Sequence, residues 1–162
     1  MSGVLASVDK RTQLVGENRL ELLLFYLHSR HLFALNVFKV KEVVKLPQIS
    51  KIPHAHPKVS GVVNIRGESI PVIDLRRAIN MPEAKHIEDT NLVITEYNRT
   101  VQGFLIGKVD QIINMTWSDI MPPPTAIGKN HYLTALTKVK RDGQEQLVEI
   151  IDVEKVLAEI VE

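Results

Sequence analysis

The stretch KVKEVVKL at residues 39–46 returns in altered form as KVDQIINM at residues 108–115, an offset of 108 − 39 = 69. Apolar positions are kept in both stretches, and a Pro-rich segment follows each copy. A repeat of this kind indicates two copies of one supersecondary unit. The residues paired by the offset are Lys39 and Lys108, Val40 and Val109, Val43-Val44 and Ile112-Ile113, Leu46 and Met115, Ala34 and Gly103, and Arg30 and Arg99.

The segments on either side of this repeat predict β-hairpins. Short runs rich in strand-forming residues alternate with polar turns, and the second half keeps the order of the first without a gap. The expected strands are LELLLFYL at 20–27, HLFALNVF at 31–38, KVKEVVKL at 39–46, VSGVVNIR at 59–66, SIPVIDL at 69–75, TNLVITEY at 90–97, VQGFLIG at 101–107, KVDQIINM at 108–115, YLTALTKV at 132–139 and QLVEIID at 146–152.

Two helix starts occupy equivalent places in the two copies. Ile73-Asp74-Leu75 reappears as Ile151-Asp152-Val153, and an aspartate in this position favours an N-cap. We expect a single helical turn after Asp74 and a terminal helix from Asp152 to about Val161. The terminal helix carries apolar residues at helical spacing, namely Val153, Val156, Leu157 and Ile160.

The pattern predicts an all-β protein. About five short strands in each copy favour a small closed or nearly closed barrel, so we expect two five-stranded barrels in a duplicated arrangement with a short C-terminal helix. Each half alone has a thin core, so the two lobes should share a third apolar seam. The expected division is an N-terminal arm at 1–19, a first lobe at 20–82, a connector at 83–90 and a second lobe at 91–162, with strands allowed to cross between lobes.

Composition restricts the class of protein. Of 162 residues, 44% are hydrophobic and 24% charged, which is typical of a globular protein, and the net charge of +1 provides no general attraction to nucleic acid or anionic membrane. Cysteine is absent, which fits a reducing compartment. The first residues lack the apolar core of a secretory signal, and the longest apolar runs, such as residues 22–27, are far too short to cross a bilayer. We expect a cytoplasmic protein that does not insert into membranes.

The sequence contains no recognisable catalytic motif: there is no GxSxG elbow, Gly-rich phosphate loop, HExxH or nucleophilic cysteine. His54 and His56 lie in a Pro-flanked loop without a third ligand at a metal-binding spacing, so we expect no metal site. Asp74 and Asp152 are explained as helix caps, and Trp117 as a core residue at a strand end. We therefore expect neither enzymatic activity nor a cofactor.

Four lysines near the first repeat, Lys39, Lys41, Lys45 and Lys51, suggest a nucleic-acid patch. Glu42 interrupts the row and aromatic residues make up only 5% of the chain, whereas a single-strand-binding barrel needs stacking aromatics beside its charges. A nucleic-acid-binding barrel and a barrel that binds a small ligand or acts as an enzyme remain the two alternatives to a protein-binding module.

Several motifs together resemble the CheW family. GVVNIRGESIPVIDLR at 61–76 follows that family's pattern GxxNxRGxxxPxxDLR, FALNVFKVKEVV at 33–44 resembles its KVxEI strand, and residues 131–157 resemble its closing hairpin and helix. The opening at 3–27 is similar to the start of CheV proteins, in which a receiver domain follows a CheW-like domain. Nothing after Leu157 could form a receiver.

The resemblance implies two SH3-like barrels and a non-enzymatic adaptor of chemotaxis signalling. Its implied partners are the regulatory domain of the histidine kinase CheA and the cytoplasmic tip of methyl-accepting chemoreceptors. It also implies that Glu42 pairs with Arg66, and we expect that pair to be partly buried. We further expect an apolar trough between the lobes that accepts a receptor helix. The expected partner-binding residues are Lys39, Val40, Glu42, Val43, Asn64, Arg66, Gly67, Val156, Leu157 and Ile160.

Overall fold

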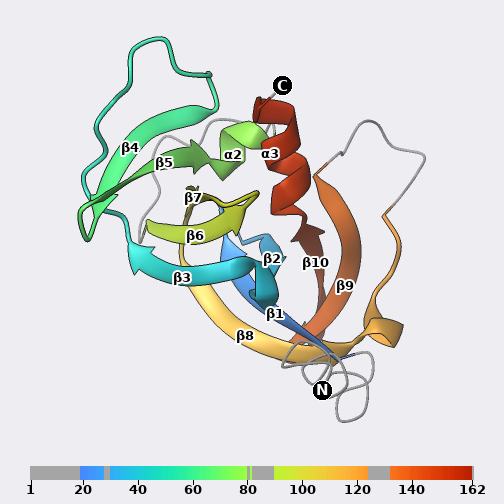
Figure 1. Cartoon of the computed structure of the whole chain (residues 1–162). Coiled ribbons are helices and arrows are strands. Elements are labelled where there is room, and N and C mark those ends of the chain that lie inside the picture. The colour runs from blue at the N-terminus through green and yellow to red at the C-terminus, as the bar shows by residue number, and fades with distance from the viewer. Residues whose placement is uncertain (1–18, 28–29, 80, 82–89, 124–131, 162) are drawn as a thin grey trace, which may run out of the picture.

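The computed structural model describes residues 19–27, 30–79, 81, 90–123 and 132–161. Almost all of the expected arm and connector lie outside this part of the chain. The described residues form ten strands and four short helical segments, so the all-β fold class is confirmed (Figure 1). The elements are β1 Arg19–Tyr26, β2 Leu32–Asn36, η1 Val37–Lys39, β3 Val40–Lys45, β4 Val59–Ile65, β5 Glu68–Asp74, α2 Leu75–Ala78, β6 Asn91–Tyr97, β7 Thr100–Ile106, β8 Val109–Thr116, η2 Trp117–Asp119, β9 Leu133–Arg141, β10 Gln144–Ile151 and α3 Val153–Val161.

The ten strands form two five-stranded sheets, each of which curls into a barrel. Barrel A has the strand order β8-β1-β2-β10-β9 and barrel B the order β3-β6-β7-β5-β4. Raising or lowering every strand number by five converts one order into the other, which confirms the duplication. In each barrel the chain beyond the edge strand bridges to the far side of the sheet, at Ser50–Val62 in barrel B and at Met121–Leu136 in barrel A. Both barrels are therefore nearly closed.

The barrels do not coincide with the halves of the sequence. Strands β1 and β2 pair with β8, β9 and β10, while β6 and β7 pair with β3, β4 and β5. Strands therefore cross between the expected lobes at 20–82 and 91–162, an exchange that the sequence left open. Each half contributes one hairpin to the other half's barrel, which ties the two barrels together.

The registers of the strands refine the repeat. Ile150 lies opposite Ala34 in the parallel pair of β10 and β2, and Val72 lies opposite Gly103 in the parallel pair of β5 and β7. Ala34 and Gly103 are therefore equivalent, as the offset of 103 − 34 = 69 requires. The expected match without a gap is wrong for β1, because Leu22 faces Ile113 and its counterpart Leu92 faces Val44, an offset of 92 − 22 = 70. The first hairpin is one residue longer than its copy.

Three apolar clusters account for this architecture. One fills barrel A, one fills barrel B, and the third, here called the central seam, lies between them. On β1, Leu22 and Leu24 face the interior of barrel A while Leu23 and Phe25 face the central seam. Both faces of the strand are buried, which explains why its sequence is continuously apolar rather than alternating. The expected third apolar seam is confirmed.

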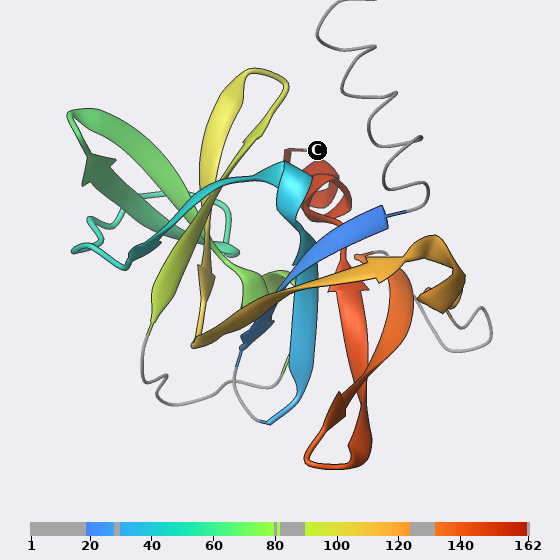
Figure 2. The ribbon, with the colours of Figure 1, turned by 90° about the horizontal axis from the view of Figure 1, so that it is seen from below.

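Helix α3 lies at the junction of the two barrels and covers the central seam (Figure 2). Its start is capped by Asp152, whose Oδ1 accepts a hydrogen bond from the Glu154 backbone N–H at 2.9 Å. Asp74 caps α2 in the same way, with Oδ1 3.1 Å from the Arg76 backbone nitrogen. Both expected N-caps are confirmed.

Candidate partner-binding surface

The charged pair Glu42–Arg66 forms, and it joins the edge strand of barrel B to the β4–β5 turn. Arg66 Nη1 lies 3.5 Å from Glu42 Oε2, and Nη2 makes a second, closer contact with Oε1. The hydrogen bond to Glu42 and its negative charge raise the pKa of Arg66. The Arg66 side chain is 72% exposed and that of Glu42 34%, so the expected partial burial is wrong for the arginine. The guanidinium can reach another molecule.

The β4–β5 turn fixes the position of this arginine. Arg66 and Gly67 both have positive φ, 50° and 83°, as a two-residue type I′ hairpin turn requires. Asn64 Oδ1 accepts a hydrogen bond from the Gly67 backbone N–H at 3.0 Å. A Cβ at Gly67 would meet nothing within 4 Å, so the backbone conformation rather than space favours glycine there. Asn64, Arg66 and Gly67 thus act as one unit that presents Arg66.

The other expected residues at strand β3 differ in how exposed they are. Val40 is partly buried and packs against the central seam, whereas Val43 is 37% exposed. Lys39, just before the strand, pairs with Glu154 of α3 at 2.6 Å. A register shift between Val40 and Glu42 puts Val40 and Val43, opposite Thr95 and Val93, on one face of β3 and Glu42, opposite Ile94, on the other.

The apolar face of α3 does not line an open trough. Val156 and Leu157 are each 2% exposed and belong to the central seam, and Ile160 is partly buried against it. The expected role of Val156 and Leu157 in direct partner contact is therefore wrong in this structure. An amphipathic helix buries its apolar face against the largest apolar surface within reach, and here that surface is the junction between the barrels.

A second charged pair, which sequence reasoning missed, lies on the edge strand of barrel A, close to but not at the positions equivalent to Glu42 and Arg66. Arg141, at the end of β9, contacts Asp110 of the edge strand β8, with 2.9 Å between Nη1 and Oδ1. The side chains of this pair are 28% and 16% exposed, less than those of the Glu42–Arg66 pair. Hydrogen bonding to Asp110 raises the pKa of Arg141. The adjoining β9–β10 turn, Asp142-Gly143, has positive φ values of 51° and 79°, close to those of its copy in barrel B.

An exposed apolar residue accompanies each charged pair. Ile112 on β8 is 56% exposed and is the counterpart of Val43 on β3 by the offset of 112 − 43 = 69. The repeat in the sequence already paired Ile112 with Val43. It did not predict the Asp110–Arg141 contact, because Asp110 and Arg141 do not occupy the positions equivalent to Glu42 and Arg66. Each barrel thus has an edge strand with an exposed aliphatic side chain and an arginine–carboxylate pair beside it.

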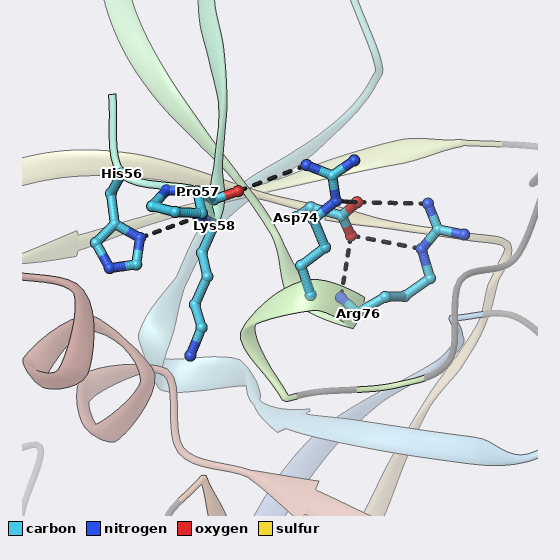
Figure 3. A network of polar contacts seen from close by, with 6 residues as sticks. His56, Pro57, Lys58, Asp74 and Arg76 are labelled. Carbon is cyan, nitrogen blue, oxygen red and sulfur yellow. Dashed lines mark hydrogen bonds and ion pairs between the residues drawn. The ribbon is translucent and has the colours of Figure 1, made fainter. Parts of the chain in front are cut away.

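The polar residues next to α2 form a structural network (Figure 3). Asp74 is 7% exposed and contacts Arg76 Nε at 3.4 Å and Arg77 Nε at 3.8 Å. His56 Nδ1 accepts a hydrogen bond from the Lys58 backbone N–H at 3.1 Å. Lys58 Nζ lies 3.7 Å from Glu159 Oε2 of α3. These contacts hold the Pro-rich loop against both helices, and the described residues contain no cluster of three metal-binding side chains.

The lysines of the suspected nucleic-acid patch are partly neutralised. Lys39 pairs with Glu154 at 2.6 Å and Lys41 with Glu96 at 3.5 Å. The edge strand therefore offers little net positive charge to a phosphate backbone.

Trp117, expected in the core, is 51% exposed at the end of β8.

Two nearly closed barrels that share a hydrophobic seam, each with an apolar and charged edge, define a duplicated β-barrel scaffold. The model of the CheW-like domain matches residues 21–161, and the chain belongs to this family. It is 28% identical to the chemotaxis protein CheW of Bacillus subtilis over 85% of this chain and 86% of that protein. It is 30% identical to the chemotaxis protein CheV1 of Helicobacter pylori over 99% of this chain, and the alignment spans 54% of CheV1.

A solved structure shows the same fold. The crystal structure of the scaffolding protein TtCheW from Thermoanaerobacter tengcongensis superposes with a TM-score of 0.72 and 28% sequence identity, covering 82% of this chain and 88% of that one. The duplicated barrel, the C-terminal helix and the relatives agree in placing the chain among the adaptors of chemotaxis signalling.

Proposed function

We propose that this adaptor couples the histidine kinase CheA to methyl-accepting chemoreceptors without catalysing a reaction itself. The observation that carries the proposal is the presence of two pseudo-equivalent surfaces on two barrels joined by a shared apolar seam. Each has an edge strand with one exposed aliphatic residue, Val43 or Ile112, beside an arginine–carboxylate pair. Two similar but non-identical surfaces allow one adaptor to hold two different proteins at a fixed spacing.

The two partners are assigned to the two surfaces by their chemistry. The receptor tip binds beside the Glu42–Arg66 pair, and on the same edge Lys39 and Val40 reach the junction of the barrels, where they contact Glu154 of α3 and the central seam. Arg66 is the most exposed member of the pairs and can exchange Glu42 for a carboxylate on a receptor helix. The regulatory domain of the kinase packs against the edge of β8 around Ile112, where a less exposed pair supports a more apolar contact.

The proposal places the chain in the cytoplasm, where a kinase domain and a receptor tip can meet. No helix in the described ranges is long and apolar enough to cross a membrane. Binding to the receptor should be reversible, with a Kd of about 1 μM, because signalling contacts below roughly 1,200 Å² are usually weak.

The decisive experiment compares matched variants on the two surfaces. Arg66→Ala should weaken capture of a receptor-tip fragment and leave capture of the kinase regulatory domain unchanged, while Ile112→Asp should do the reverse. Arg99→Ala serves as the control, because Arg99 is also an exposed arginine with positive φ in a two-residue hairpin turn. If neither Arg66→Ala nor Ile112→Asp changes the binding of either fragment, the proposed surfaces are wrong.

A further inference from the structure

Both edge strands carry a β-bulge at the same place in the repeat. The register between β3 and β6 shifts at Lys41, which has no Cα partner on β6. The register between β8 and β1 shifts in the same way at Asp110. The offset of 110 − 41 = 69 makes the two bulged residues equivalent. Bulges at a sheet edge interrupt regular pairing and redirect a side chain. The repeat therefore has a lysine at one bulge and an aspartate at the other.

The bulge of barrel A is closed by an ion pair. Arg141, at the end of β9, contacts Asp110 through both terminal nitrogens, with Nη1 2.9 Å from Oδ1. The Asp110 side chain is only 16% exposed. Two parallel contacts between a guanidinium and a carboxylate fix the orientation of both groups. At this bulge the edge of barrel A thus presents a fixed pair of opposite charges that cancel.

The bulge of barrel B is held more loosely. Lys41 Nζ lies 3.5 Å from Glu96 Oε1, and the two side chains are 51% and 49% exposed. An ion pair so open to water contributes about 1 kcal/mol or less. The next carboxylate along the strand, that of Glu42, is already held by Arg66. A carboxylate on another molecule can therefore replace Glu96 at Lys41 with little loss of stability.

The two edges resemble each other in their apolar residues and differ in the charge at the bulge. Val43, two residues after Lys41, is 37% exposed, and Ile112, two residues after Asp110, is 56% exposed. Two aliphatic side chains of similar size discriminate poorly between partners. A charge that meets an opposite or a like charge on the partner discriminates well. The difference between Lys41 and Asp110 is therefore suited to decide which partner binds which edge.

We propose that Lys41 is a specificity-determining residue, which selects for barrel B a helix that presents a carboxylate beside an aliphatic side chain. This inference rests on the proposed function, which assigns the receptor tip to this edge. In the complex, Lys41 Nζ donates a hydrogen bond to the receptor carboxylate and releases Glu96. The edge of barrel A, where Arg141 already binds Asp110, takes the kinase domain through apolar contacts.

The test measures the affinity of a receptor-tip fragment and of the kinase regulatory domain for variants at position 41. Lys41→Gln should weaken the receptor fragment about fivefold at low salt and Lys41→Glu should weaken it further, while affinity for the kinase domain stays within about twofold. Lys41→Arg keeps the cation and should retain the affinity for the receptor fragment. The losses should shrink as salt is raised, because salt screens half-exposed charges.

The matched control is Lys45→Gln, which removes an exposed lysine from the same strand without altering the bulge. It should leave both affinities unchanged. In a set of receptor fragments with single Glu→Lys or Asp→Lys changes, one fragment should bind Lys41→Glu more tightly than it binds the unchanged chain. Circular dichroism checks that each variant is folded.

The inference is overturned if Lys41→Gln and Lys41→Glu bind the receptor fragment as the unchanged chain does. It is also overturned if Lys45→Gln reproduces the loss, or if the kinase domain is weakened as much as the receptor fragment. In each of these cases the proposed function still stands, provided that the unchanged chain binds both fragments. If the unchanged chain binds neither fragment, the proposed function fails and this inference fails with it.

Discussion

Arg66 and Arg141 show how exposure decides what a charged pair contributes. Arg66 is 72% exposed, and a pair so open to water and salt adds little to stability. Arg141 and Asp110 are 28% and 16% exposed, so removal of the arginine leaves a largely buried carboxylate without its partner. We expect Arg141→Ala to lower the free energy of unfolding clearly more than Arg66→Ala does. Urea denaturation of both variants measures this order, and equal losses would contradict it.

Thr95 and Gln102 are buried residues on the seam side of barrel B whose side-chain oxygens, Oγ1 and Oε1, lack hydrogen-bond partners. They lie opposite each other on β6 and β7. Their counterparts in barrel A are Phe25 and Phe33, whose rings stack at 6.2 Å. One side of the central seam is thus filled by aromatic rings, and the other contains polar atoms that have lost water without a replacement.

We predict that Thr95→Val stabilises the protein by about 1–3 kcal/mol, because a buried unsatisfied polar group costs about that much. Thr137→Val is the matched control, since Thr137 is equally buried but its Oγ1 donates a hydrogen bond to the Asp119 carbonyl at 2.9 Å. The control should lose about 1 kcal/mol. Urea denaturation midpoints of the two variants should move in opposite directions, and a shift in the same direction would refute the assignment.

At the scale of single elements, α3 is the element whose role in the structure differs most from the role predicted from its sequence pattern. Two ion pairs attach it to the first half of the chain, through Lys39–Glu154 at 2.6 Å and Lys58–Glu159 at 3.7 Å. Its apolar face closes the central seam. The helix therefore contributes to stability first, and to partner binding only through the position it gives to Lys39.

We predict that Leu157→Ala destabilises the protein by about 2–5 kcal/mol, the usual range for such a change in a core. Its side chain is 2% exposed, so truncation leaves a cavity in the central seam. Ala158, on the exposed side of the same helix, provides the control Ala158→Ser, for which we expect little change. Thermal unfolding followed by circular dichroism measures both, and a Leu157→Ala variant with unchanged stability would show that the helix does not close the seam.

At the scale of the whole molecule, the strand exchange makes the two barrels one cooperative unit. Neither barrel can form from a continuous half of the chain, because each needs a hairpin from the other half. The central seam also draws buried residues from both barrels. Unfolding of one barrel therefore removes strands from the other, and we expect a single transition.

We predict that fragments 1–82 and 83–162 are each unfolded in isolation and regain native structure when mixed. The reason is that fragment 1–82 lacks β6 and β7 of barrel B, and fragment 83–162 lacks β1 and β2 of barrel A. Dispersion of amide NMR signals measures folding of each fragment and of the mixture. A well-dispersed spectrum from either fragment alone would show that a half of the chain folds independently.

The sequence alone determined the features that depend on local pattern or on the repeat. Strand positions, both N-caps, the shared seam and the pairing of Glu42 with Arg66 were all predicted before the structure was known, the last through resemblance to a family. Alternation, turn residues and caps act over a few residues, so a single segment carries the information. The repeat also identified Val43 and Ile112 as equivalent positions.

Only the tertiary structure decided which strands pair, which apolar faces remain open, and how exposed the charged pairs are. The continuous apolar run of β1 shows that both faces are buried, yet it fits either barrel equally well, because neighbouring strands are selected by the whole sheet. The apolar face of α3 was also ambiguous in the sequence. It would line a groove if the barrels stood apart, but it closes a core because the barrels touch. The Asp110–Arg141 pair joins residues 31 positions apart, and the fold alone brings them together.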